Sequence, residues 1–206
     1  MNEVLFLVIP IIIISIIIHE VAHGWAALFL GDKTAQYAGR LTINPLPHID
    51  IIGSILLPVA TAVSTGLVLG YAKPVPYNPD NLRPVNWLGK EWAEAIVAFS
   101  GPAINFVLAI LFALVIRVCD LLNIVLDPLV AQALVIVVFI NIFLGLLNLI
   151  PVPPLDGSKI LFTFVGFRVR RFMEQYSLVL ILVALFLVLS TPLLEWPAQF
   201  IVGVLL

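Results

Sequence analysis

The chain has 206 residues, of which 62% are hydrophobic and 11% are charged; soluble domains are about half apolar and a quarter charged. A mean hydropathy of +1.18 leaves too little polar surface to cover a water-soluble fold, so an all-α integral membrane protein is predicted. The net charge of −2, without a basic tract, gives no reason to expect a nucleic-acid partner. The single cysteine, Cys119, excludes an intrachain disulfide and a cysteine-based metal site.

Four stretches approach or exceed the roughly 20 apolar residues that a membrane-spanning helix needs: 4–30, 93–117, 129–150 and 176–194. The first is expected to stay as a span, because it lacks the basic segment and cleavage site of a signal peptide. No repeat or linker divides the chain. Residues 1–206 are therefore expected to form one membrane domain, with a core over about 4–165 and a C-terminal span at 176–194.

Two further apolar segments do not fit a simple span. Residues 51–70 are interrupted by Gly53, Pro58 and Gly66, a pattern that favours a re-entrant or broken segment covered by protein or lining a wet cavity. The final segment, EWPAQFIVGVLL, is too short to cross and is predicted to be an interfacial tail, with Trp196 near the lipid headgroups.

The basic residues test whether 51–70 crosses. If it crosses, seven of them lie on one side and three on the other. If it turns back, only Arg117 lies opposite the other nine, which are Lys33, Arg40, Lys73, Arg83, Lys90, Lys159, Arg168, Arg170 and Arg171. The positive-inside tendency favours the second arrangement, with the nine-residue face in the cytoplasm and the N-terminus outside.

The sequence HEVAH within the first span carries the chemistry. On a helix, His19 and His23 lie one turn apart on the same face, a spacing that suits two ligands of a tetrahedral zinc ion. Glu20 between them is placed to take a proton from a water at the ion. The alternative is a histidine pair bonded between helices with a neutral Glu20, but an ionisable residue inside a span favours a functional site.

A catalytic zinc needs a third protein ligand, for which His48 and Asp156 are the main candidates. Three prolines in LLNLIPVPPLDGSKI, residues 146–160, break a helix just before Asp156. Taken alone, Asp156 would be a helix N-cap. Beside an intramembrane HExxH, a carboxylate at a broken helix is the better ligand. It reaches the depth of His19 only if 51–70 turns back, in agreement with the charge count.

These motifs together resemble the site-2 protease family, the intramembrane zinc metalloproteases. HEVAHG (19–24) and NLIPVPPLDG (148–157) match the two signatures of that family, and SGPAINFVLA (100–109) resembles the helix start between them. The segments 39–50 and 70–79 resemble the short bacterial and archaeal subgroup, which lacks PDZ and CBS domains. The similarity runs from about residue 16 to 165.

The resemblance implies a role for each matching residue. His19, His23 and Asp156 would hold one zinc ion per chain, Glu20 would be the general base, and Asn148 would hold the substrate carbonyl or oxyanion. For Asn148 an interhelical hydrogen bond is the alternative. Two residues outside this set are expected to be structural: Asn105 as an interhelical hydrogen bond, and His48 as a surface histidine at the cytoplasmic rim.

The predicted function is hydrolysis of peptide bonds within or next to transmembrane segments of membrane proteins, as in regulated intramembrane proteolysis, with the active site toward the cytoplasm. Membrane lipid and transmembrane substrates are the expected partners. The segment KPVPYNP (73–79), kept extended by its prolines, would clamp an unwound substrate or form an inert interfacial loop. The rival functions are an inactive homologue that binds membrane helices and a metal transporter.

Overall fold

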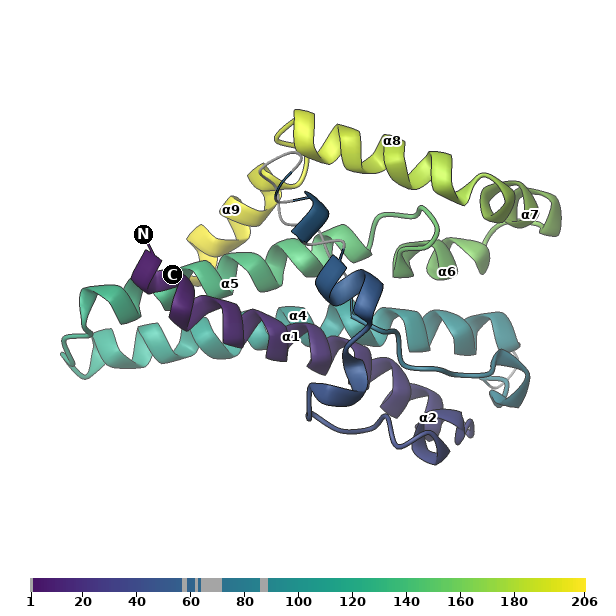
Figure 1. The fold of residues 1–206 in the computed structure, drawn as a ribbon, viewed down its shortest axis with the longest axis horizontal. Coiled ribbons are helices and arrows are strands. Elements are labelled where there is room, and N and C mark those ends of the chain that lie inside the picture. Colours follow the sequence, from purple (N-terminus) through teal and green to yellow (C-terminus); the bar gives the residue numbers. More distant parts are fainter. Residues whose placement is uncertain (1, 57–58, 62, 64–71, 86–88) are drawn as a thin grey trace.

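The computed structural model describes the chain except for residues 1, 57–58, 62, 64–71 and 86–88, and the described part is built from helices (Figure 1). The long helices are α1 (Asn2–Phe29), α4 (Lys90–Leu121) and α5 (Pro128–Asn148). The shorter elements are α2 (Thr34–Tyr37), η1 (Leu46–His48), η2 (Ile51–Leu56), η3 (Pro79–Asn81), α6 (Asp156–Phe162), α7 (Phe167–Gln175), α8 (Ser177–Ser190) and α9 (Glu195–Leu205).

Three of these helices are long and apolar enough to cross a membrane, and they match the first three predicted spans within about four residues. The fourth differs. The predicted span 176–194 is a 14-residue helix, α8, which qualifies only together with α7, from which it is bent by 75°. The helix ends at Ser190 because Pro192 disfavours helical backbone in the residue before it. The chain is thus a multi-pass, all-α membrane protein.

The long helices form one packed unit, in which α4 lies against both α1 and α5. Many buried residues of α4 are small, among them Ala98, Gly101, Ala109 and Ala113. Small side chains let helices approach closely in a membrane, where apolar burial alone provides little drive for association. The close approach of α4 to α1 follows from this composition.

The helix ends carry recognisable signals. Gly31, with a φ of +105°, ends α1, and the Asp32 amide donates to the Ala27 carbonyl at 2.9 Å. Asp127 caps the start of α5 by accepting from the Leu129 amide at 2.9 Å. The motif SGPAINFVLA does not start a helix as predicted: α4 begins at Lys90 and continues through Pro102.

The C-terminal segment, predicted as an interfacial tail, forms the helix α9. Ala198 of α9 is fully buried against Ala109 and Val138 of the core, whereas Trp196 on the other side is 71% exposed. Sequence reasoning did not predict this packing onto α4 and α5.

Half of the residues of 51–70 lie outside the described part of the chain. The first six residues of this segment form the short helix η2. The prediction that this segment turns back therefore stays a prediction, although the arrangement of the site agrees with it.

Candidate metal centre

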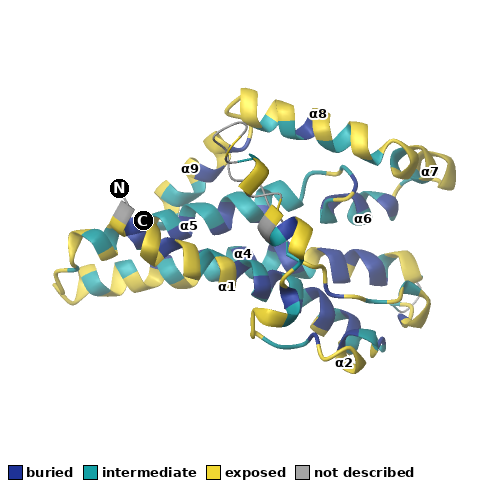
Figure 2. Ribbon diagram, viewed as in Figure 1, coloured by how far each residue is buried: buried dark blue, intermediate teal, exposed yellow. Residues whose placement is uncertain are grey.

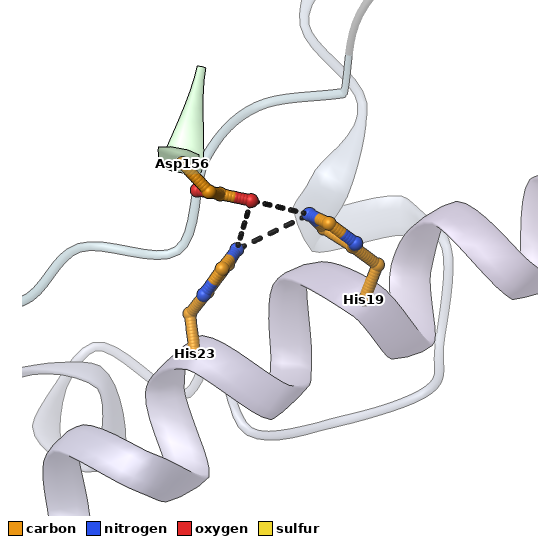
Figure 3. A group of neighbouring side chains, drawn as sticks. All are labelled: His19, His23 and Asp156. Atoms are coloured by element: carbon orange, nitrogen blue, oxygen red, sulfur yellow. Dashed lines mark hydrogen bonds and ion pairs between the residues drawn. The ribbon is translucent and has the colours of Figure 1, made fainter. Parts of the chain in front are cut away.

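Two histidines project from one face of α1 toward the helix interface. His19 and His23 are 7% and 8% exposed, and their Nε2 atoms lie 3.2 Å apart. The spacing of four residues places the two rings one turn apart, as predicted from the sequence. The two Nε2 atoms thus lie close together on the same side of α1 (Figure 3).

Asp156 reaches the two histidines from a helix that lies much later in the sequence. The helix α5 ends at Asn148, the turns over 149–155 redirect the backbone, and Asp156 is the first residue of α6. Its Oδ2 lies 3.2 Å from Nε2 of His19 and 3.4 Å from Nε2 of His23. Leu155 is the N-cap of α6 and Asp156 is its first helical residue, so Asp156 is not the N-cap that it would be if taken alone.

The three ligand atoms fit a tetrahedral ion. Ligands bound at about 2.0–2.1 Å around a tetrahedral centre are separated by roughly 3.3 Å, close to the three distances given above. Two imidazole nitrogens and one carboxylate oxygen are also a donor set that zinc accepts. Among the described residues, no other group of three histidine, cysteine or acidic side chains comes together in this way.

A hydrogen bond at the other ring nitrogen, Nδ1, fixes the orientation of the His23 ring. Its Nδ1 lies 2.8 Å from the Val97 carbonyl oxygen, which can only accept, so Nδ1 carries the proton and Nε2 keeps its lone pair for a metal. The Ser100 hydroxyl also donates to this carbonyl, at 2.6 Å. The helix α4 therefore sets the tautomer of a histidine on α1.

Gly101 of α4 makes this approach possible. A Cβ atom at this position would lie 2.5 Å from Cε1 of His23 and 2.6 Å from Cε1 of His19. Only a residue without a side chain fits against both imidazoles, and any larger one would displace a ligand.

Glu20 lies beside the two histidines and lines the same cavity, which has a volume of about 240 Å³. One of its oxygens, Oε2, accepts a hydrogen bond of 3.0 Å from the backbone amide of Val75. The loop that follows the predicted re-entrant segment therefore covers one side of the Glu20 carboxylate, and Oε1 is the other oxygen that can take a proton.

Asn148, Lys159 and Tyr77 complete the polar wall of the cavity. The Asn148 amide donates one proton to the Leu144 carbonyl at 3.1 Å, which leaves its second N–H for another acceptor. Burial, followed by the negative charge of Glu94, raises the pKa of Tyr77 to about 12. The Tyr77 phenol therefore stays protonated at neutral pH.

His48 does not join the metal centre, and its predicted place on the surface is wrong. The side chain is 2% exposed, and its Nε2 lies 2.9 Å from the Thr42 carbonyl oxygen. The turn η1 folds this histidine back into the loop, where its own carbonyl accepts from the Lys73 amide. Asn105 is 1% exposed, and its Oδ1 has no hydrogen-bond partner among the described residues, so the expected interhelical bond through that oxygen is absent.

Sequence reasoning missed four residues that shape the site. Gly101 and Ser100 lie in a motif that was recognised, but their contacts to the histidines depend on how α4 crosses α1. Lys159 lies one turn after Asp156 on α6, so its spacing of three residues was the available signal. Val75 acts through its backbone amide, for which no side chain gives a signal.

Comparison with known proteins points to one family. The profile of Peptidase family M50 matches residues 121–191, the part that contains Asp156. "Putative zinc metalloprotease YwhC" of Bacillus subtilis is 34% identical over 197 residues, covering 90% of this chain and 82% of that protein. "Putative zinc metalloprotease Rip2" of Mycolicibacterium smegmatis is 31% identical over 157 residues, covering 75% of this chain and 55% of that protein.

No solved structure matches the chain significantly. The sequence relationship to YwhC nevertheless extends over nine-tenths of the chain. The chain therefore belongs to Peptidase family M50, the site-2 protease family of metalloproteases.

Proposed function

We propose that this protein is an intramembrane zinc metalloprotease that cleaves peptide bonds within or next to transmembrane segments. The observation that supports this best is the meeting of His19, His23 and Asp156, within hydrogen-bond distance of one another, in a cavity that Glu20 also lines. Three of the helices that line the cavity, α1, α4 and α5, are long and apolar enough to cross a membrane.

His19, His23 and Asp156 would hold one zinc ion. When bound, zinc polarises a carbonyl group and lowers the pKa of a water to roughly 7. Glu20 is the general base: it takes a proton from the attacking water and returns that proton to the leaving amine. The Val75 amide orients Oε2 of Glu20 and leaves Oε1 for this transfer.

Asn148 would bind the substrate in this scheme. One of its amide protons is bonded within α5, so the side chain is held at the cavity wall with its second N–H available. A donor in that position can hold the carbonyl oxygen of the scissile bond as negative charge develops on it.

The substrates would be transmembrane proteins, because the site lies among membrane helices rather than on a water-soluble domain. A substrate helix has its peptide groups engaged in internal hydrogen bonds, so it must unwind locally before cleavage. The basic loops favour a cytoplasmic position for the active site and an N-terminus outside. Cleavage of this kind is typical of regulated intramembrane proteolysis.

The test is a trapping experiment followed by a cleavage assay. The Glu20→Gln protein should retain zinc and capture uncut membrane proteins, which can be identified by mass spectrometry after crosslinking. The wild-type protein in liposomes should cut those captured proteins, and a chelator should stop the cleavage.

Each rival function gives a different result. An inactive homologue would bind the captured proteins without cutting them in any zinc-loaded preparation. A transporter would move zinc across the liposome membrane, and this transport would depend on Asp156. Either result would contradict the proposed protease.

A further inference from the structure

The segment Lys73–Asn78, hereafter the cavity segment, is held at both ends by buried groups. At one end the Lys73 amide donates to the His48 carbonyl at 2.9 Å. At the other end the Asn78 amide donates to Oδ2 of Asp32, a residue with no exposed surface, at 2.8 Å. Between these points Val75, which is 4% exposed, donates its amide to Glu20.

Arg40 contacts the first two residues of the cavity segment. Its Nη2 donates to the Lys73 carbonyl at 2.8 Å and to the Pro74 carbonyl at 3.3 Å. Arg40 is only 8% exposed, and no described carboxylate lies within ion-pair distance of it. Burying a charge costs free energy unless neighbouring groups stabilise it. The two backbone carbonyls are the groups that accept hydrogen bonds from the buried Arg40 guanidinium.

One of those carbonyls belongs to the peptide group that bonds Glu20. The Pro74 carbonyl and the Val75 amide are parts of a single rigid plane, in which the C=O and N–H point in opposite directions. Arg40 holds one side of this plane and Glu20 accepts from the other. Fixing the carbonyl therefore fixes the direction of the N–H that orients the Glu20 carboxylate.

The geometry points to Arg40 as a positioning residue for Glu20, acting through the Pro74–Val75 peptide group. This inference rests on the proposed function, because it concerns the residue proposed as the general base. Arg40 itself touches neither the metal ligands nor the cavity. Its removal should therefore lower the rate of the chemical step while substrate binding and zinc binding are kept.

The first experiment compares Arg40→Met, Arg40→Lys and wild-type protein on one cleaved membrane substrate. Arg40→Met should lower kcat by about 10–100-fold, the range found for residues that orient catalytic groups, with KM within about twofold of wild type and full zinc content. Arg40→Lys, which keeps one charged donor, should recover part of the rate. Lys90→Met is the matched control, because Lys90 also donates to a loop carbonyl, that of Asp80, but lies on the surface.

The second experiment removes the bridging N–H directly. Val75→Pro deletes that donor, and the position between Pro74 and Pro76 already favours the extended backbone that proline accepts. If Arg40 acts through this peptide group, Arg40→Met combined with Val75→Pro should be no slower than the slower single variant. A double variant whose loss is the product of the two single losses would overturn the proposal.

The outcomes separate this proposal from the proposed function. A wild-type protein that cuts no membrane substrate contradicts the protease itself. A wild-type protein that cuts, together with a zinc-loaded Arg40→Met that keeps the wild-type kcat, overturns only the role of Arg40. If Arg40→Met does not fold, Val75→Pro decides the matter, because an unchanged kcat in that variant would overturn the proposal equally.

Discussion

The C-terminal half of α1 and the helix α8 are both strongly apolar, yet the protein holds them in different ways. Hydrogen bonds hold the C-terminal half of α1, and Asp32 shortly after it, against the rest of the molecule. They join His23 to Val97, Glu20 to Val75, and Asp32 to Asn78. In α8 the only buried residue is Ala184, and most of its surface is exposed (Figure 2).

This difference shows what determines position in a membrane protein. Lipid tails are as apolar as leucine, so apolar side chains gain little by leaving lipid for a neighbouring helix. Hydrogen bonds and close packing of small residues therefore set the geometry of α1. Residues that take part in them should be sensitive to substitution, and residues of α8 should not.

The largest effect is expected at the metal centre. Asp156→Ala removes the ligand that joins α6 to α1, so zinc binding should be lost and cleavage should fall by more than about 10³-fold, beyond the 10–100-fold seen for residues behind the ligands. Metal analysis of the purified protein measures the first and substrate cleavage the second. Asp127→Ala, which removes a helix cap far along the chain, is the control and should keep zinc. Full zinc content in Asp156→Ala would contradict the ligand assignment.

The next effect is expected at the contact between α4 and α1. Gly101→Ala places a methyl group 2.5 Å from the His23 ring, so it should weaken zinc affinity by about 10–100-fold and destabilise the fold by about 1–3 kcal/mol. Zinc titration and thermal unfolding in detergent measure the two effects. Gly203→Ala in α9 meets open space and should be neutral or slightly stabilising. Equal zinc affinity and equal stability of the two variants would show that the close approach of α4 to the histidines of α1 is not required.

A smaller effect is expected at Asp32, where the loop is attached. Burial raises the pKa of this carboxyl, but hydrogen bonds from Thr34, Asn81 and Asn78 outweigh it and bring the pKa below the ordinary value of 3.8. The stability that these bonds provide is therefore full above about pH 4 and declines as the pH falls through the lower folded-state value.

Asp32→Asn should cost about 1–3 kcal/mol at neutral pH, because the amide that replaces the buried carboxylate accepts fewer of the hydrogen bonds from Thr34, Asn78 and Asn81. It should also remove part of the acid-dependent loss of stability, measured as the change in melting temperature from pH 6 to pH 3. Asp80→Asn, an exposed position between Asn78 and Asn81, should behave as wild type. An unchanged acid response in Asp32→Asn would assign that response to other carboxylates.

The smallest effect is expected in α8. Leu182 is 58% exposed, so Leu182→Ala should change the free energy of unfolding by less than about 0.5 kcal/mol. Ile142 in α5 is fully buried, and Ile142→Ala should cost about 2–5 kcal/mol. Unfolding of both variants in the same detergent gives the comparison. A cost at Leu182 as large as that at Ile142 would show that α8 is packed against a partner.

The sequence predicted which side chains meet at the candidate metal centre better than it predicted the packing around them. HEVAH and Asp156 stood out because ionisable residues are rare in apolar segments, and the helix period fixes the relation of His19 to His23. The first three spans followed from apolar length alone.

The features that the sequence did not reveal depend on contacts between distant segments. Whether His48 lies on the surface or is buried against the cavity segment depends on how the loops fold. The residues next to His48 in the sequence do not predict that fold. The packing of α9 depends on space left between α4 and α5. The role of Val75 depends on a backbone group that almost every residue has.

The order of the ligands along the chain has a consequence for synthesis. His19 and His23 emerge from the ribosome well before Asp156, which follows His23 by 133 residues. A nascent chain that stops before α6 carries His19, Glu20 and His23 but lacks Asp156, the proposed third ligand. On the proposed function, the growing polypeptide would therefore stay inert until the helices that line the cavity have been inserted.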